Sequence, residues 1–212
     1  SPSVDTSDHW RVARKGGRPG LKLLMALGIS LAPGCTLLAP PRVEPLNAND
    51  ANSPVMAEVI SLDSFDAARL SDAIFRETNQ VRRQLGLRPF TRLNQLDRAA
   101  DIQASSNALG GAAIHGNLIH EWATPFDRVV NVGLRPNIVS ENAAMLPLLD
   151  FDVSKGYYER KTPEGTVIVA AQTGRVAHAH TYAGFAQAIV RAWMNSPEHR
   201  ANIVNPRLRV LG

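Results

Sequence analysis

The chain of 212 residues contains a single cysteine, Cys35. One thiol cannot form an internal disulfide, and it cannot supply the pair of sulfur ligands that a Cys-based zinc site needs. A fold without these cross-links has to be stabilised by packing. The hydrophobic fraction of 44% and the charged fraction of 20% are typical of a globular protein and exclude the collagenous, coiled-coil and wholly disordered classes. We therefore expect one packed domain with appendages.

The positive charge of the chain is concentrated at its N-terminus. The formal net charge is +4. Residues 1–34 hold five basic residues and only two acidic ones, namely Arg11, Arg14, Lys15, Arg18 and Lys22 against Asp5 and Asp8. The rest of the chain is close to neutral, so the high isoelectric point does not indicate phosphate binding, and we expect no nucleic-acid partner.

A short apolar run, residues 21–31, follows these basic residues. It is too short for the roughly 20 residues of a membrane-spanning helix, and the order of basic, apolar and small zones is that of a signal peptide. The run leads into Ala32-Pro33-Gly34-Cys35, which resembles a bacterial lipobox with Ala32 where Leu is preferred. Ordinary cleavage after Gly34 also fits this pattern. We predict that residues 1–34 are a signal peptide of lipoprotein type and that Cys35 carries a lipid.

The protein is accordingly expected to be exported, either as a membrane-anchored lipoprotein of the cell envelope or as a secreted protein. Residues 35–62 lack sustained periodicity and contain Pro and Asn clusters, so they are predicted to form a flexible tether. The folded domain is expected at 63–212.

Amphipathic periodicity predicts helices near residues 70–85, 94–108, 126–132 and 185–195, the second capped by Asn94. Arg82 and Arg83 are expected on an exposed helix face, and Phe126 is expected to point inward. Two strand-prone runs flank Thr162-Pro163-Glu164-Gly165. They predict a hairpin inserted near 150–180.

No motif in the chain names a reaction: a Gly-rich phosphate loop, G-x-S-x-G and H-E-x-x-H are all absent from the sequence. Instead, several short pieces occur in order. They are Asn79-x-x-Arg82-x-x-x-Gly86-Leu87, Leu96-x-x-Ala99-Ala100, His115, Glu141-Asn142, and Trp193-Met194-Asn195-Ser196-Pro197-Glu198-His199-Arg200-Ala201-Asn202-Ile203.

These pieces resemble the bacterial branch of the CAP superfamily, the cysteine-rich secretory, antigen 5 and pathogenesis-related proteins, also called SCP-like extracellular proteins. The resemblance covers about residues 70–212, and its last stretch is the most specific, with Glu198 where the family usually has Gly. It implies an α+β fold, a three-layer α-β-α sandwich. Family members usually continue beyond the position of Gly212 with two more strands. We therefore expect a sheet that lacks its C-terminal strands, with an exposed edge unless the hairpin substitutes.

The resemblance also implies a site. In the family, two His and up to two Glu line a shallow cleft, and some members hold a divalent metal there. His199 matches the second His and Glu141 matches one Glu, while the first His is either His115, which we favour, or His120. Two imidazoles and one carboxylate with an open position would suit zinc, and they would equally suit no metal. Structural roles are implied for the remaining motif residues, Asn142, Trp193, Ser196, Arg200 and Asn202.

Two functions from different classes are open at this point. One is a non-catalytic binding module for a small amphiphile, an envelope component or a protein partner. The alternative is a metal-dependent hydrolase in which the His115, Glu141 and His199 site activates water. If Glu141 is a ligand, no obvious base remains, and if it is the base, only two His ligands remain. We therefore expect a binding module rather than an enzyme.

Overall fold

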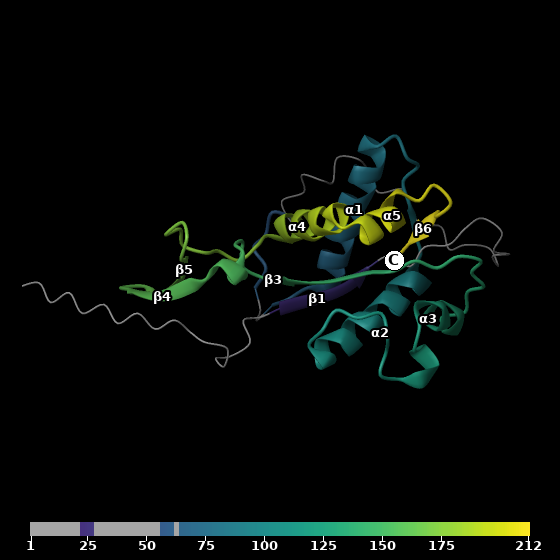
Figure 1. The fold of residues 1–212 in the computed structure, drawn as a ribbon, viewed down its shortest axis with the longest axis horizontal. Coiled ribbons are helices and arrows are strands. Elements are labelled where there is room, and N and C mark those ends of the chain that lie inside the picture. The colour runs from purple at the N-terminus through teal and green to yellow at the C-terminus, as the bar shows by residue number, and fades with distance from the viewer. Residues whose placement is uncertain (1–21, 28–55, 62–63) are drawn as a thin grey trace, which may run out of the picture.

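A computed structural model describes residues 22–27, 56–61 and 64–212. Cys35, most of the predicted signal peptide and most of the predicted tether lie outside these residues. The helices form two layers with strands between them (Figure 1). Helices α1 (Ala67–Gln84), α4 (Tyr182–Asn195) and α5 (Pro197–Val204) lie on one side of strands β1 (Lys22–Leu27) and β3 (Asn142–Pro147), and α2 (Asn94–Gly110) and α3 (Pro125–Asn131) lie on the other. The predicted α-β-α sandwich is confirmed, with a narrow central layer.

Two apolar clusters, one in each helical layer, form the core. The larger lies between α1 and α4 and includes Leu70, Ile74, Phe185, Ile189 and Trp193. The smaller lies between α2 and α3 and includes Leu93, Leu96, Val129, Val132 and Leu134. Trp193, for which the sequence implies a structural role, is 2% exposed and belongs to this core.

Helix α1 corresponds to the helix predicted near residues 70–85, and it begins three residues earlier, at Ala67. The Asp66 side chain caps it by accepting a hydrogen bond from the Arg69 amide at 2.9 Å. The chain leaves the helix at Gly86, whose φ of +68° is a left-handed conformation that glycine adopts without strain.

The prediction that Arg82 is exposed is wrong. Its side chain is buried, and its Nε donates to the carbonyl oxygen of Arg88 at 2.8 Å. Its Nη1 donates to the carbonyls of Ile203 and Asn205, at the C-terminal end of α5, and the guanidinium lies 3.8 Å from the ring centroid of Phe90. The negative end of the α5 dipole and the ring face compensate the buried charge. Arg83, next in the chain, is exposed as expected.

Helices α2 and α3 bring two smaller corrections. Leu93, and not Asn94, occupies the cap position of α2, and no side chain caps this helix. Helix α3 starts as predicted, with a capping box formed by Thr124 and Asp127. Phe126, however, is 50% exposed. The buried face of this short helix is taken by Arg128 and Val129, which leaves Phe126 on the solvent side.

The predicted hairpin is confirmed as β4 (Tyr157–Thr162) paired antiparallel with β5 (Gly165–Ala170). It extends away from the helical layers (Figure 1) and forms a sheet of its own. The hairpin therefore does not replace an edge strand beside β3. Two further short strands, β2 (Thr91–Arg92) and β6 (Val210–Leu211), pair in parallel.

Strand β1 comes from the apolar run that the sequence predicts to be the core of a signal peptide. It pairs antiparallel with β3 along its whole length, from Lys22 opposite Pro147 to Leu27 opposite Asn142, and α2 packs against it. A chain that retains this segment uses it as a strand, and a chain that loses it leaves β3 without this neighbour. Cleavage after Gly34 stays a prediction.

The packed domain begins earlier than residue 63. Met56 and Ile60 are buried in the larger apolar cluster. The Ile60 amide donates to the carbonyl of His180 at 2.9 Å, and the Tyr182 amide donates to the carbonyl of Glu58 at 3.1 Å. The last residues assigned to the tether thus lie against the start of α4, because two apolar side chains and the backbone both find partners there.

Candidate functional site

Three polar side chains, His115, Arg128 and Glu141, form what we call the carboxylate cluster. Arg128 Nη2 donates to both oxygens of the Glu141 carboxylate, at 2.8 and 2.7 Å. His115 Nδ1 lies 2.9 Å from Oε1 of the same carboxylate. The side chains of Arg128 and Glu141 are 0% and 1% exposed, whereas that of His115 is 52% exposed. A buried ion pair therefore carries a half-exposed imidazole at its surface.

The charge on Glu141 acts on His115. The hydrogen bond to Glu141 is the main cause that raises the pKa of His115 above its ordinary value, against the opposing effect of partial burial. The negative charge of Glu198 raises this pKa further, and the Arg128 guanidinium lowers it. Glu198, which stands where the family usually has Gly, thus contributes to the electrostatics of the cluster.

Next to Glu141, hydrogen bonds connect α5 with the start of β3. Asn202 Nδ2 donates to Oδ1 of Asn142 at 2.8 Å and to the carbonyl of Glu141 at 3.3 Å. Asn142 Nδ2 in turn donates to the backbone carbonyl of His199 at 3.1 Å. These bonds hold the start of β3 against α5, and both Asn142 and Asn202 act as scaffold hydrogen-bonders here.

His199 takes part in this region mainly through its backbone. Its Nδ1 forms a hydrogen bond of 2.9 Å with the Ser196 hydroxyl, which consequently makes no capping bond to the backbone of α5. No described contact joins the His199 imidazole to His115 or Glu141. Arg200, the next residue, is exposed.

Of the two candidates for the first histidine, it is His115 that contacts Glu141. His120 opens the short 3-10 helix η2 (His120–Trp122) and is exposed. The same element is tied to the cluster by Arg128, whose Nη1 donates to the carbonyl of Trp122 at 2.8 Å.

The residues of this region do not fit a metal ion. In the part of the chain that the structure describes, no group of three or more His, Cys, Asp or Glu side chains converges as a metal site would require. Both oxygens of Glu141 already accept hydrogen bonds from a guanidinium. A cation at this carboxylate would have to displace or face the Arg128 charge.

Arg128 and two buried amides of α2 are the site residues that sequence reasoning missed. Gln103 Nε2 donates to the carbonyls of Ile114 and Gly116, at 2.7 and 2.9 Å, and so holds the loop that carries His115. Asn107 Nδ2 donates to the Ile114 carbonyl at 3.0 Å. The signal was available: Gln103 and Asn107 lie four residues apart, on the same helix face as the small apolar residues Ala99 and Ala100.

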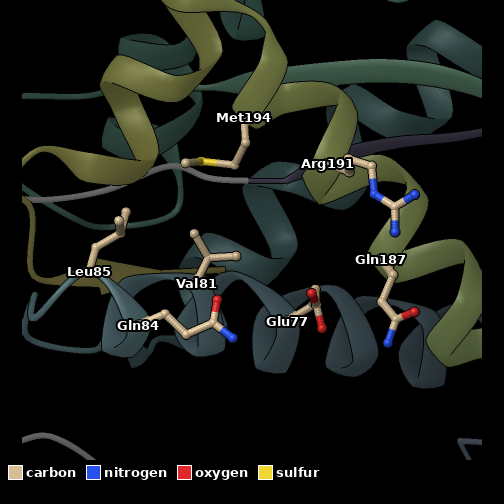
Figure 2. A pocket seen from close by; sticks show the side chains of 7 residues that line it. All are labelled: Glu77, Val81, Gln84, Leu85, Gln187, Arg191 and Met194. Atoms are coloured by element: carbon tan, nitrogen blue, oxygen red, sulfur yellow. The ribbon is translucent and has the colours of Figure 1, made fainter.

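A groove of about 370 Å³ lies on the other side of the sheet, between α1 and α4. It is lined by Glu77, Val81, Gln84, Leu85, Gln187, Arg191 and Met194. Figure 2 shows the apolar side chains of Val81, Leu85 and Met194, with the amide of Gln84 beside them, towards one end, and the charged side chains of Glu77 and Arg191 towards the other. The groove is therefore amphipathic along its length.

The charged end of the groove contains one acid and one base from facing helices. Burial is the main cause that raises the pKa of Glu77, and the positive charge of Arg191 partly offsets it. This end can therefore interact with a polar or charged head group, while the opposite end offers apolar side chains to a hydrocarbon chain.

Comparison with known proteins places this chain in a family. The model of the CAP family, described as the cysteine-rich secretory protein family, matches residues 75–212. No curated protein and no solved structure shows significant similarity to the chain. None of the helices in the described residues is both long and apolar enough to cross a membrane. The matched residues include most of both helical layers, the carboxylate cluster and the Trp193–Ile203 signature, and the chain belongs to the CAP family.

Proposed function

We propose that this CAP domain is a non-catalytic binding module that takes a small amphiphile in the groove between α1 and α4. The observation that carries the proposal is the polarity of the groove. Val81, Leu85 and Met194 offer apolar surface to a hydrocarbon chain, and Glu77 with Arg191 offers charge to a head group. If the ligand is instead an envelope component or a protein partner, the domain is still a non-catalytic binding module.

The carboxylate cluster argues against the hydrolase alternative. A general base has to reach its substrate with a free lone pair. Glu141 is 1% exposed, and its two oxygens accept hydrogen bonds from Arg128 and His115. This carboxylate is suited to fix the His115 loop against α3, and that role favours a structural function for the cluster.

The groove is tested with a fluorescent single-chain fatty acid as the probe. We expect saturable binding to the wild-type chain, followed by fluorescence anisotropy, and a loss of about tenfold or more in affinity for Met194→Glu, because a carboxylate at the apolar end disfavours the hydrocarbon chain. Leu109→Glu is the matched control, since Leu109 lies on α2, is 86% exposed and is not part of the groove. Equal losses in the two variants, or unchanged binding in Met194→Glu, would contradict the assignment.

We further propose that the protein is exported and anchored through Cys35. The support is the order of the basic, apolar and small zones before the only cysteine of the chain. Mass spectrometry of protein extracted from membranes of the expressing cells is expected to show a lipid-modified Cys35 at the mature N-terminus. A free Cys35 thiol, or a mature N-terminus at another residue, would reject the anchor.

A further inference from the structure

Four arginines gather at the C-terminal end of α1 and the C-terminal end of the chain, and we call them the arginine face: Arg83, Arg88, Arg207 and Arg209. The first three are exposed and Arg209 is half-buried. The stretches 78–96 and 199–212 contain no Asp or Glu. Within the described residues, none of the four forms an ion pair. A nearly neutral domain therefore has one local region of uncompensated positive charge.

Backbone contacts place these arginines together although they are distant in the sequence. The Thr91 amide donates to the carbonyl of Arg209 at 3.0 Å, which joins the turn after α1 to the last strand. The buried Arg82 bonds the carbonyls of Arg88 and Asn205, and so fixes the turns that carry Arg88 and Arg207. The charge of Arg209 adds to burial in lowering the pKa of Arg82, in agreement with this proximity.

An apolar residue lies beside the positive charges. Leu85 is 48% exposed, and its amide donates to the carbonyl of Arg82 at 3.2 Å, so it belongs to the turn that carries Arg83. Leu85 also lines the apolar end of the groove. The arginine face is therefore adjacent to the apolar end of the groove.

We propose that the arginine face docks the domain on an anionic lipid bilayer. The four arginines stand on separate turns, so they suit an extended anionic surface better than a single small anion. Basic side chains with an exposed apolar residue among them are a combination that binds the interface of anionic membranes. This inference does not require the groove to hold an amphiphile. Docking through the arginine face would turn the apolar end of the groove towards the lipid.

The test is sedimentation of the full chain with phosphatidylcholine vesicles that contain about 30% phosphatidylglycerol. This share of anionic lipid gives the vesicle surface a strongly negative potential. Pure phosphatidylcholine vesicles are the neutral comparison. Arg88→Gln/Arg207→Gln is expected to lower the partition coefficient by about 25-fold, at roughly fivefold for each arginine. Raising the salt concentration should remove the difference between this variant and wild type.

The matched control is Arg98→Gln/Arg160→Gln, which removes the same charge from exposed sites on α2 and β4. It keeps any binding by the basic N-terminal segment, as the first variant does. An equal loss in both variants would overturn the proposal, and so would no loss in either. Full displacement by millimolar inorganic phosphate would also overturn it, because the face would then be a small-anion site. Fatty-acid binding in the groove should survive both double variants, which separates this test from that of the proposed function.

Discussion

Among the residues that the structure describes, two arginines, Arg82 and Arg128, are at most 1% exposed, and their charges are compensated in different ways. Arg82, on α1 and facing α5, has backbone carbonyls and the ring of Phe90 as its partners within the described part of the chain. Arg128, on α3, has the carboxylate of Glu141. Carbonyl oxygens carry no net charge, so these contacts leave the positive charge of Arg82 uncancelled, whereas the carboxylate of Glu141 balances the charge of Arg128.

This difference assigns the two regions different functions. The positive charge of the Arg82 region adds to that of the exposed arginines around it, and this suits contact with an anionic surface. In the carboxylate cluster, the charged groups pair with each other and bind the loop that carries His115, and this suits a structural role. The predictions below separate the two kinds of compensation, beginning with the largest expected effect.

Removing Arg128 should have the largest effect on stability. Arg128→Ala leaves the Glu141 carboxylate buried without its partner, and breaking a buried pair in this way costs about 3–5 kcal/mol in the free energy of unfolding. Urea denaturation measures this loss. The double variant Arg128→Met/Glu141→Gln removes both charges and should lose much less. If the double variant is as unstable as Arg128→Ala, the pairing of charges is not what stabilises this region.

Removing Arg82 should cost less. Arg82→Ala leaves the carbonyls of Arg88, Ile203 and Asn205 without their donors, but carbonyl oxygens can regain hydrogen bonds from water that enters the space. We expect a loss of about 2–3 kcal/mol in the free energy of unfolding, measured by urea denaturation. Because Arg82 has no carboxylate partner within the described residues, Arg82→Met should be no worse than Arg82→Ala. A clearly larger loss than for Arg128→Ala would reverse the comparison.

The sequence predicts the local elements of the fold better than the burial of Arg82 and Arg128. Helix α1, its stop at Gly86 and the hairpin follow from local periodicity and turn residues, so they are predictable. The burial of Arg82 is not, because its partners Ile203 and Asn205 are more than a hundred residues away. An arginine next to Arg83 in a polar helix segment resembles a solvated residue until the distant carbonyls are in place.

The candidate site shows the same limit. The resemblance to the family identifies His115 and Glu141, and the structure brings these two together. Arg128 lies on a short helix between Phe126 and Val130, and nothing in its local pattern says that it faces Glu141 rather than solvent. The strand role of residues 22–27 is likewise unpredictable, since the same apolar run satisfies the pattern of a signal peptide. The near-neutral charge of the domain hides the arginine face, because net charge carries no information about position.

A third, smaller effect is expected where α5 joins β3. Asn202→Ala removes hydrogen bonds to Oδ1 of Asn142 and to the carbonyl of Glu141, next to the Arg128 pair. Both bonds are neutral and only partly buried, so we expect a loss of about 1 kcal/mol in the free energy of unfolding. Thermal melts check this. The control is Asn205→Ala, which should differ little from wild type. A loss as large as that of Arg128→Ala would mean that the carboxylate cluster depends on α5 for its position.

The smallest effect concerns the pH dependence that only the Arg128 region should show. The pKa of His115 is raised in the folded protein, so the stabilisation from its charged form is fully present below the ordinary value near 6.5 and is lost as the pH rises through the raised value. The difference in free energy of unfolding between wild type and His115→Gln should therefore be largest in mildly acidic solution and shrink in mildly alkaline solution. It should be modest, because the imidazole is 52% exposed and water screens the interaction. His120→Gln is the matched control for loss of an exposed imidazole, since no described contact joins His120 to Glu141. A difference for His115→Gln that is flat with pH, or that grows as the pH rises, would show that Glu141 does not act on this imidazole and that the cluster is as insensitive to pH as the Arg82 region.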